Sequence, residues 1–226
     1  MLIRLIGQMV LSLVCVNIAI ISLILPASSA PPSGPIRIVA LGDSLTAGLG
    51  LAAGEALPAV LQRLLTAQGQ SVEIQNAGVS GDTTAGGLAR LDWSVPDGTD
   101  AVILALGAND MLGGLSPVRA RANLEAIVSR LKARKIAVLL AGMRASRSLG
   151  DDYANAFDRI YPNLAEGNEL LFYPFLLTGV ALDPGLNQRD GIHPTAEGVR
   201  QMARRMLPLV EQLVAKVREQ RLRDGQ

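Results

Sequence analysis

Short apolar runs alternate with longer amphipathic segments along most of the chain. The apolar runs are continuous and bounded by Gly, Asp or Asn, which is typical of strands buried on both faces, although periodicity alone does not separate them from the centres of buried helices. The runs lie at residues 36–41, 71–76, 101–106, 136–141 and 169–173. Segments with helical spacing lie at residues 55–68, 84–91, 117–135, 151–166 and 195–221.

This alternation predicts an α/β fold. Parallel strands joined by right-handed crossovers give an open sheet with helices on both faces. In such a sheet the ligand site is built from the loops beyond the carboxyl ends of the strands. The loops after the first three predicted strands, at 42–50, 77–83 and 107–114, are also polar and rich in glycine. We therefore expect the functional site there.

The first thirty residues have the pattern of a secretory signal. Arg4 precedes an apolar stretch at 5–25, and small residues stand at Ser28 and Ala30. This predicts a signal peptide at 1–30 with cleavage after Ala30 and export to the periplasm or the medium. The stretch also approaches the roughly 20 residues that span a bilayer, so an uncleaved N-terminal membrane anchor is the alternative. Membrane contact is expected only through this segment.

The rest of the chain reads as a short spacer at 31–35 and one domain at 36–226. Loss of Arg4 with the leader lowers the 21 Lys and Arg residues to 20, which equals the 20 Asp and Glu residues. A neutral domain without a basic stripe is a poor partner for nucleic acid. We expect a monomer that binds a small molecule or a lipid.

Cysteine and histidine counts exclude several kinds of chemistry. Cys15, inside the leader, is the only cysteine, so disulfides, a thiol nucleophile and cysteine zinc sites are excluded from the mature chain. A single histidine excludes multi-histidine metal sites, and no Asp/Glu cluster has loop-type ligand spacing. We expect no metal and no cofactor.

The single histidine, His193, is a candidate general base. Histidine can take up and return a proton near neutral pH, so serine-based acyl transfer here must use this residue. Ser44, three residues after the first predicted strand, is the candidate nucleophile. Asp190 precedes His193 in a turn with Gly191, so its carboxylate can reach Nδ1. The alternative roles are structural: a helix cap for Ser44 and a buried core position for His193.

Two further loops bring hydrogen-bond donors to the same edge. Negative charge developing on an acyl oxygen must be met by aimed donors. The second loop offers the backbone amide of Gly78 and the third offers the side-chain amide of Asn109. Each residue also has a possible structural role: Gly78 can simply form a turn, and the Asn109 side chain can bond to its own backbone in the loop. The combination supports a catalytic site more strongly than any one residue does, because each of the three loops supplies one of the groups that acyl transfer needs.

Four segments, in this order, resemble the SGNH hydrolases, the GDSL esterase and lipase family. They are Gly-Asp-Ser-Leu at 42–45, Asn-Ala-Gly at 76–78, Gly-Ala-Asn-Asp at 107–110 and Asp-Gly-Ile-His-Pro at 190–194. The longer strings at 41–48 and 155–162 resemble the exported bacterial thioesterase, lysophospholipase and arylesterase subgroup.

The resemblance implies a flavodoxin-like, doubly wound α/β/α fold with about five parallel strands. It also implies hydrolysis of esters or thioesters through an acyl-enzyme. Ser44 would attack, His193 would be general base and then general acid, and Asp190 would hold the imidazole tautomer. The backbone N–H groups of Ser44 and Gly78 and the side chain of Asn109 would bind the oxyanion.

Other functions compete with this one. Residues 48–53 fit the dinucleotide-binding pattern G-x-G-x-x-G/A, but the first glycine does not directly follow the strand, and the acidic partner Glu73 falls inside the second strand. The α/β-hydrolase elbow G-x-S-x-G would need glycine where Thr46 stands. A non-enzymatic relic and an acetyl-specific deacetylase of the same fold complete the alternatives.

The acyl group of the substrate is expected to be aliphatic or aryl. Apolar residues beside the predicted crevice are candidates for its walls, although core packing would suit several of them equally well. The candidates are Leu45, Met111, Leu112, Met143, Leu176 and Leu177. The polar stretch 144–152 is either a flap on the substrate side or a surface loop.

Overall fold

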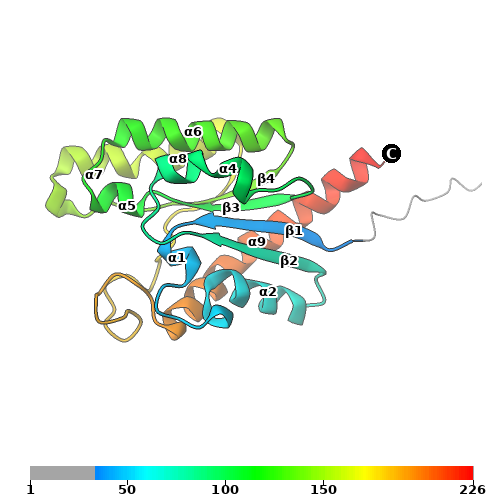
Figure 1. The fold of residues 1–226 in the computed structure, drawn as a ribbon, viewed down its shortest axis with the longest axis horizontal. Helices are drawn as coiled ribbons and strands as arrows, with labels where there is room; N and C mark the ends of the chain where they lie inside the picture. Colours follow the sequence, from blue (N-terminus) through cyan, green and yellow to red (C-terminus); the bar gives the residue numbers. More distant parts are fainter. Residues whose placement is uncertain (1–33, 226) are drawn as a thin grey trace, which may run out of the picture. The chain divides into compact units, whose positions relative to one another are not determined.

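The computed structural model describes residues 34–225, and five parallel strands form its sheet in the order β2-β1-β3-β4-β5 (Figure 1). The strands are β1 (Ile36–Gly42), β2 (Val72–Gly78), β3 (Ala101–Ala105), β4 (Ala137–Ala141) and β5 (Leu171–Tyr173). Strands β3 and β4 are buried along their whole length, which explains their uninterrupted apolar sequences. The predicted parallel sheet is confirmed.

Helices cover both faces of this sheet, as Figure 1 shows. On one face lie α2 (Leu57–Ala67) and α9 (Ala196–Asp224), which pack against each other. On the other face α6 (Pro117–Ala133) packs against α3 (Thr84–Ala89) and α8 (Ile160–Asn168). The core lies between these layers and the sheet. The three-layer α/β/α architecture is confirmed.

The helix predicted at 151–166 is two helices, α7 (Asp151–Asp158) and α8. Pro162 explains the break. A proline lacks the backbone N–H and its ring crowds the carbonyl four residues earlier, which here belongs to Asp158. Helix α7 therefore ends at that residue, and Pro162 lies in the first turn of α8.

Other element boundaries also differ from the prediction. The helix predicted at 84–91 ends at residue 89, as α3, and residue 91 begins a second short helix, α4 (Leu91–Ser94). Gly86 and Gly87 lower the helix propensity of this segment. The segment predicted to begin at 55 opens with the 3-10 turn η1 (Ala53–Glu55) before α2. A second 3-10 turn, η2 (Arg147–Leu149), precedes α7.

Two short helices stand where loops were predicted. They are α1 (Ser44–Ala47), directly after β1, and α5 (Ala108–Leu112), directly after β3. Each is little longer than one turn, too short to show a 3.6-residue apolar period, and isolated helices of this length are not stable by themselves. Tertiary packing therefore forms them.

The topology places a crevice at the carboxyl ends of β1 and β3. Strand β1 leads through α2 to β2 on one side, and the chain then returns over the opposite face to β3, so the loops after β1 and β3 diverge. In the sheet register Gly42 lies opposite both Gly78 and Ala105. The residues that follow these three positions consequently emerge side by side.

The predicted leader at 1–30 and most of the spacer at 31–35 lie outside the described residues. Gly34 and Pro35 are described, and their carbonyl oxygens accept hydrogen bonds from the Arg221 guanidinium, each at 3.0 Å. Between residues 34 and 225, no helix combines the length and the hydropathy needed to cross a membrane.

Candidate active site

Ser44 is the first residue of α1, at the carboxyl end of β1. Asp43 caps this helix, because its Oδ1 accepts the Leu45 N–H at 3.0 Å. Only glycine fits at Gly42, since a Cβ there would overlap the Thr46 hydroxyl and approach the Ala105 carbonyl. The tight turn from β1 into α1 thus holds Ser44 at the crevice, where its side chain is largely buried.

His193 lies in a small hairpin before α9. Asn187 and Pro194 form an antiparallel bridge, and the Gln188 N–H donates to the His193 carbonyl at 2.7 Å. The Gln188 side chain donates to the Leu49 carbonyl at 2.8 Å and so connects this hairpin to the segment after α1. The imidazole is therefore held in place by a hairpin that is bonded to a segment 139 residues away in sequence.

The side chains of Ser44, His193 and Asp190 form one continuous hydrogen-bonded line. His193 Nε2 is 2.8 Å from Ser44 Oγ, and His193 Nδ1 is 2.7 Å from Asp190 Oδ2. The other carboxylate oxygen of Asp190 accepts the backbone N–H groups of Ile192, at 2.9 Å, and His193, at 3.0 Å. The turn predicted around Gly191 thus brings the carboxylate to Nδ1.

Hydrogen bonding also fixes the charge of Asp190. The backbone N–H groups of His193 and Ile192, together with the His193 ring, lower the pKa of the Asp190 carboxyl to about 2. The carboxylate is therefore an acceptor near neutral pH. It holds the imidazole hydrogen on Nδ1, which leaves the Nε2 lone pair directed at the Ser44 hydroxyl.

Two hydrogen-bond donors belong to residues that line the cavity at Ser44. The Ser44 N–H is at the start of α1 and has no acceptor among residues 34–225. The Asn109 side chain donates one N–H to the Asp82 carbonyl at 2.8 Å, which leaves its second N–H for another acceptor. Ser44 and Asn109 line the same cavity.

The predicted donor Gly78 is not available to a substrate in this structure. Its N–H donates to the Asn76 side chain at 2.9 Å, and its lack of a side chain serves close packing, because a Cβ would overlap the backbone N of Ala47. Gly81, three residues later, has a left-handed φ of 83°, and no described residue accepts its N–H. It directly precedes Asp82, to which Asn109 is bonded.

Arg90 is a positioning residue that the sequence did not reveal. Its guanidinium bonds to the Gly42 carbonyl at 2.9 Å, the Ala77 carbonyl at 2.8 Å and the Asp82 carboxylate at 2.6 Å. One side chain thereby connects the turn after β1 with the turn after β2. An arginine at the end of a predicted amphipathic helix gives no signal of this role.

Asp43 is fully buried beside the nucleophile, and its Oδ2 has no hydrogen-bond partner among the described residues. Burial raises the pKa of the Asp43 carboxyl to about 6, against the opposing effect of the Leu45 N–H and the charge of His193. The sequence identified this residue only as part of the Gly-Asp-Ser-Leu segment. Its burial is a tertiary property.

A mainly apolar cavity of about 570 Å³ opens beside Ser44 and His193. Of the six residues predicted as walls, Leu45, Met111, Leu112, Met143 and Leu177 line it. Leu176 does not, because its side chain is completely buried in the core. Residues 144–147 of the predicted flap also line this cavity. No group of three His, Cys, Asp or Glu side chains that could hold a metal ion occurs between residues 34 and 225.

Comparison with known proteins places the chain in a family. Residues 40–201 match the model of the GDSL-like Lipase/Acylhydrolase family. Esterase TesA of Pseudomonas aeruginosa is 35% identical over 178 residues, 78% of this chain and 89% of TesA. Thioesterase 1/protease 1/lysophospholipase L1 of Escherichia coli K12 is 37% identical over 178 residues, 76% of this chain and 84% of that protein.

Comparison with a solved structure indicates the same family. The crystal structure of AlinE4, an SGNH-hydrolase family esterase, superposes with a TM-score of 0.68 and 46% identity over 80% of this chain and 97% of AlinE4. Fold, site and comparisons thus define a serine hydrolase that acts on carboxylic esters. The chain belongs to the GDSL-like lipase/acylhydrolase family, also called the SGNH hydrolases. The dinucleotide-binding and α/β-hydrolase alternatives are excluded by this membership.

Proposed function

We propose that the protein hydrolyses carboxylic esters or thioesters through an acyl-enzyme formed on Ser44. The hydrogen-bonded line from Asp190 through His193 to Ser44, at the mouth of an apolar cavity, is the observation that carries this proposal. A hydroxyl becomes an effective nucleophile when a base accepts its proton. In this site the base, its orienting carboxylate and the hydroxyl are already in hydrogen-bonding contact.

The reaction takes place in two halves. Ser44 Oγ attacks the carbonyl carbon while His193 Nε2 accepts the hydroxyl proton, and the imidazolium then gives this proton to the leaving alkoxide or thiolate. Water repeats the attack on the acyl-enzyme with His193 again as base, and the acid product leaves. Asp190, ionised above its pKa of about 2, stabilises the imidazolium in both halves.

Three donors bind the oxyanion in this proposal: the Ser44 N–H, the Asn109 side chain and the Gly81 N–H. The first two follow the sequence prediction. Gly81 replaces Gly78, because the Gly78 N–H is bonded to Asn76 whereas no described residue accepts the Gly81 N–H. Donors of this kind are most effective when they are fixed before the reaction. The Asn109 side chain is bonded to the carbonyl of Asp82, the residue after Gly81, so this bond connects the Asn109 and Gly81 donors.

The cavity supports acyl groups longer than acetyl. Its walls are aliphatic, and each buried methylene contributes about 0.8 kcal/mol, so binding improves with chain length until the cavity is filled. The names of the relatives, esterase and thioesterase/lysophospholipase, support oxygen and sulfur esters of aliphatic acids as substrates. An acetyl-specific deacetylase would be expected to have a smaller, closed pocket.

The proposal is tested by covalent labelling. A fluorophosphonate phosphonylates an activated serine with loss of fluoride, so mass spectrometry of the digested protein should find the label on Ser44. Denatured protein and His193→Ala should remain unlabelled, whereas Ser148→Ala, which changes an exposed serine, should label normally. Labelling at another serine, or no labelling of folded active protein, would contradict the mechanism.

We also propose that residues 1–30 direct export to the periplasm or the medium and that the mature protein, a monomer, begins at Pro31. The small residues Ser28 and Ala30 support this cleavage site. Mass spectrometry of the exported protein should give Pro31 as the N-terminal residue. An intact leader in the membrane fraction would favour the anchor instead.

A further inference from the structure

Asn109, one of the proposed oxyanion donors, belongs to a helix that cannot hold it in place by itself. Helix α5 has five residues, and no side chain caps its N-terminus at Gly107. A helix of little more than one turn is not stable in isolation, so its orientation depends on contacts with other elements. The bonds that α5 makes with its neighbours therefore decide where the Asn109 side chain points.

Asp110, the next residue, makes two short bonds of this kind. Its side chain crosses to the first residue of α3, where Oδ2 accepts the Thr84 N–H at 2.7 Å and Oδ1 accepts the Thr84 hydroxyl at 2.6 Å. Asp110 is only 3% exposed, and Thr84 is completely buried. Hydrogen bonds that are shielded from water are stronger than those at the surface, so this pair joins α5 firmly to α3.

A third residue fixes the direction of the Thr84 hydroxyl. Asn123 of α6 donates its side-chain N–H to the hydroxyl oxygen at 3.0 Å, so the hydroxyl hydrogen is left for Asp110. Helix α5 packs against α6, and Figure 1 shows both on the same face of the sheet. The buried cluster of Thr84, Asp110 and Asn123 therefore connects three helices directly behind the Asn109 donor.

Asp110 and Asn109 bond to the same short segment of the chain. The Asn109 side chain donates to the Asp82 carbonyl at 2.8 Å. Asp110 accepts from Thr84, two residues further on. The segment also contains Gly81, whose N–H has no acceptor among the described residues. Two points of attachment prevent the rotation that one point would allow, so the two bonds together fix the Asn109 and Gly81 donors relative to each other.

From this geometry we propose that Asp110 is a positioning residue for ester hydrolysis: by bonding α3 to α5 it holds the Asn109 and Gly81 donors in the arrangement that binds the oxyanion. Asn109 lines the active-site cavity and Asp110 does not, so Asp110 acts through its neighbours. The inference rests on the proposed function, because these donors belong to that mechanism. Donors that are fixed in advance act mainly on the charge of the transition state, so the role predicts an effect on kcat rather than on KM.

The first test changes each partner of the buried pair. Asp110→Asn keeps the size of the side chain but replaces one acceptor oxygen by an NH2 group. With an aryl decanoate it should lower kcat about tenfold and leave KM within about twofold. Thr84→Val, which removes only the hydroxyl, should lower kcat about threefold or more, whereas Thr84→Ser should stay within about twofold of the wild type. Equal kcat values for the two Thr84 variants would overturn the inference, even if Asp110→Asn does not fold.

A double-variant comparison separates positioning from a general structural defect. In the Asn109→Ala background the donor that Asp110 holds is absent, so adding Asp110→Asn or Thr84→Val should lower kcat only about twofold or less. A structural defect would lower kcat by the same factor in both backgrounds, and that result would overturn the inference. Asp100→Asn is the matched control, because Asp100 also accepts a backbone N–H, that of Arg37 at 2.7 Å, but at the amino end of the sheet. It should leave kcat within about twofold in both backgrounds.

Nuclear magnetic resonance tests the positioning without catalysis. The side-chain NH2 signals of Asn109 are assigned by their absence in Asn109→Ala. These hydrogens should exchange with water about tenfold faster in Asp110→Asn and Thr84→Val than in the wild type and Asp100→Asn, because the bond to the Asp82 carbonyl opens more often. Unchanged exchange would overturn the inference. Faster exchange, together with normal kcat in Asn109→Ala, would leave Asp110 as the residue that holds Asn109 and would show that the proposed oxyanion role alone fails.

Discussion

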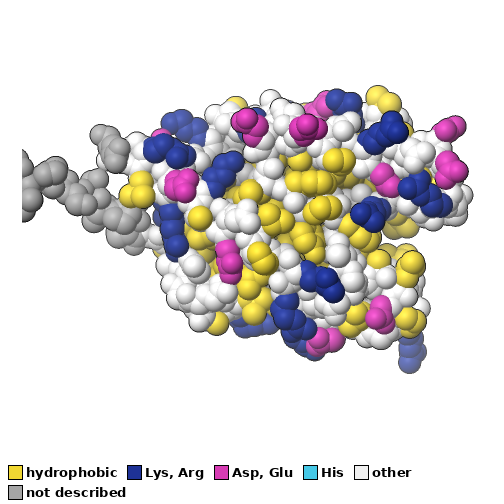
Figure 2. All heavy atoms as spheres, turned by 180° about the vertical axis from the view of Figure 1, so that it is seen from behind, with side chains coloured by type: hydrophobic (Ala, Val, Ile, Leu, Met, Phe, Trp, Pro, Cys, Tyr) yellow, Lys and Arg dark blue, Asp and Glu magenta, His cyan; other side chains and the backbone are white. Residues whose placement is uncertain are grey.

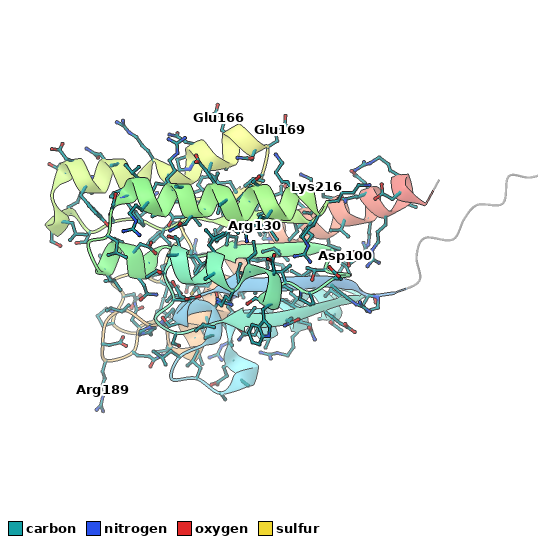
Figure 3. The ribbon with its side chains drawn as sticks, turned by 45° about the horizontal axis from the view of Figure 1, so that its top comes forward. Asp100, Arg130, Glu166, Glu169, Arg189 and Lys216 are labelled. Carbon is teal, nitrogen blue, oxygen red and sulfur yellow. The ribbon has the colours of Figure 1, made fainter. Side chains whose placement is uncertain are left out.

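The two ends of the sheet each carry a cavity of moderate size, yet they differ in how their charges are bonded. At the amino end a cavity of about 390 Å³ is lined by Asp100, Arg134, Lys135, Arg221 and Asp224. Figure 3 labels Asp100 at this end of the sheet. At the carboxyl end the cavity of about 570 Å³ contains Ser44, His193 and Arg144. Figure 2, seen from behind, shows apolar side chains on both sides of the notch at its right-hand edge.

At the amino end the charges bind one another. Arg221 donates twice to the Asp100 carboxylate, at 2.6 and 3.0 Å, and Lys135 pairs with Asp224 at 3.7 Å. The Asp100 carboxylate also accepts the Arg37 N–H at 2.7 Å. These bonds fix the end of α9 to the first residues of β1 and β3. The cavity there is a space beside a structural clamp.

At the carboxyl end several groups have no partner within the described fold. The Ser44 and Gly81 N–H groups have no acceptor among the described residues, and Arg144 has no carboxylate. Unpaired donors cost free energy unless water or a ligand satisfies them. The comparison teaches that pairing, rather than cavity volume, distinguishes the functional end of this sheet from the structural end.

The largest expected effect is that of Ser44→Ala, which should lower kcat about 10⁴-fold or more while the protein stays folded. The variant removes the nucleophile, and the remaining donors supply only the residual rate. His193→Ala should cost about as much, and the double variant no more, because the two residues act as a unit. Initial rates with an aryl decanoate and circular dichroism measure both properties. A folded Ser44→Ala protein with near wild-type activity would sink the mechanism.

Asn109→Ala should lower kcat roughly 10²-fold with little change in KM, since the donor acts mainly on the charge that develops in the transition state. Asn168→Ala is the control from the opposite end, where the side chain donates to the Leu164 carbonyl at 3.0 Å. It should leave kcat within about twofold of the wild-type value. Comparable losses from the two variants would mean that the two ends are not functionally distinct.

Asp43 and Asp100 extend the comparison to stability, because the first carboxyl is buried with an unpartnered oxygen and the second is paired. The Asp43 pKa is raised from 3.8 to about 6. Its contribution to stability is thus complete below pH 3.8 and is lost as pH rises through 6. The free energy of unfolding of the wild type, relative to Asp43→Asn, should fall by about 2 kcal/mol between roughly pH 4.5 and pH 7.5.

Urea denaturation at the two pH values measures this difference. An asparagine side chain in place of Asp43 can still accept the Leu45 N–H, so the helix cap is retained. Asp100→Asn is the control from the paired end. It keeps the Asp43 carboxyl, so the fall in the free energy of unfolding that Asp43 causes should remain in this variant. A difference between wild type and Asp43→Asn that does not change with pH would show that Asp43 does not titrate in this range.

The smallest effect is expected from Arg221→Gln. It should lower the free energy of unfolding by about 1 kcal/mol, because the Arg221–Asp100 pair is only partly buried and such pairs contribute modestly. The kcat with the same aryl ester should stay within about twofold, since the clamp lies at the far end of the sheet. A large loss of activity in a protein of normal stability would contradict the separation of the two ends.

The sequence predicted the elements whose pattern is long enough to be read. The helical spacing of α6 is long enough to be recognised by its period. The apolar runs of β3 and β4 have no period of their own, and their short length and the polar or glycine residues that bound them predicted strands. Helices α1 and α5 could not be predicted in this way. They are held by contacts with neighbouring elements, and their few residues contain no complete period.

The sequence pointed to Ser44, His193 and Asp190 through one available histidine, a serine just after the first strand, a carboxylate in the turn at Gly191, and the resemblance of these segments to the SGNH hydrolases. The sequence could not decide between Gly78 and Gly81. Both are glycines of one loop, and only the bond from the Gly78 N–H to Asn76 shows which amide is already used. Hydrogen bonds within a loop depend on its full backbone path, which residue types do not specify.

The sequence by itself therefore determined the alternation of strands and helices along the chain and the edge of the sheet that carries the site, through periodicity and connection rules. It indicated the candidate residues Ser44, His193 and Asp190 through the single histidine together with the resemblance to the SGNH hydrolases. The tertiary structure alone decided three other properties: the burial that raises the pKa of Asp43, the reach of Arg90 across two turns, and the absence of a described carboxylate near Arg144. Each depends on which groups from distant parts of the chain meet in space. The electrostatic environment of a residue depends on these long-range contacts, so the sequence around the residue does not reveal it.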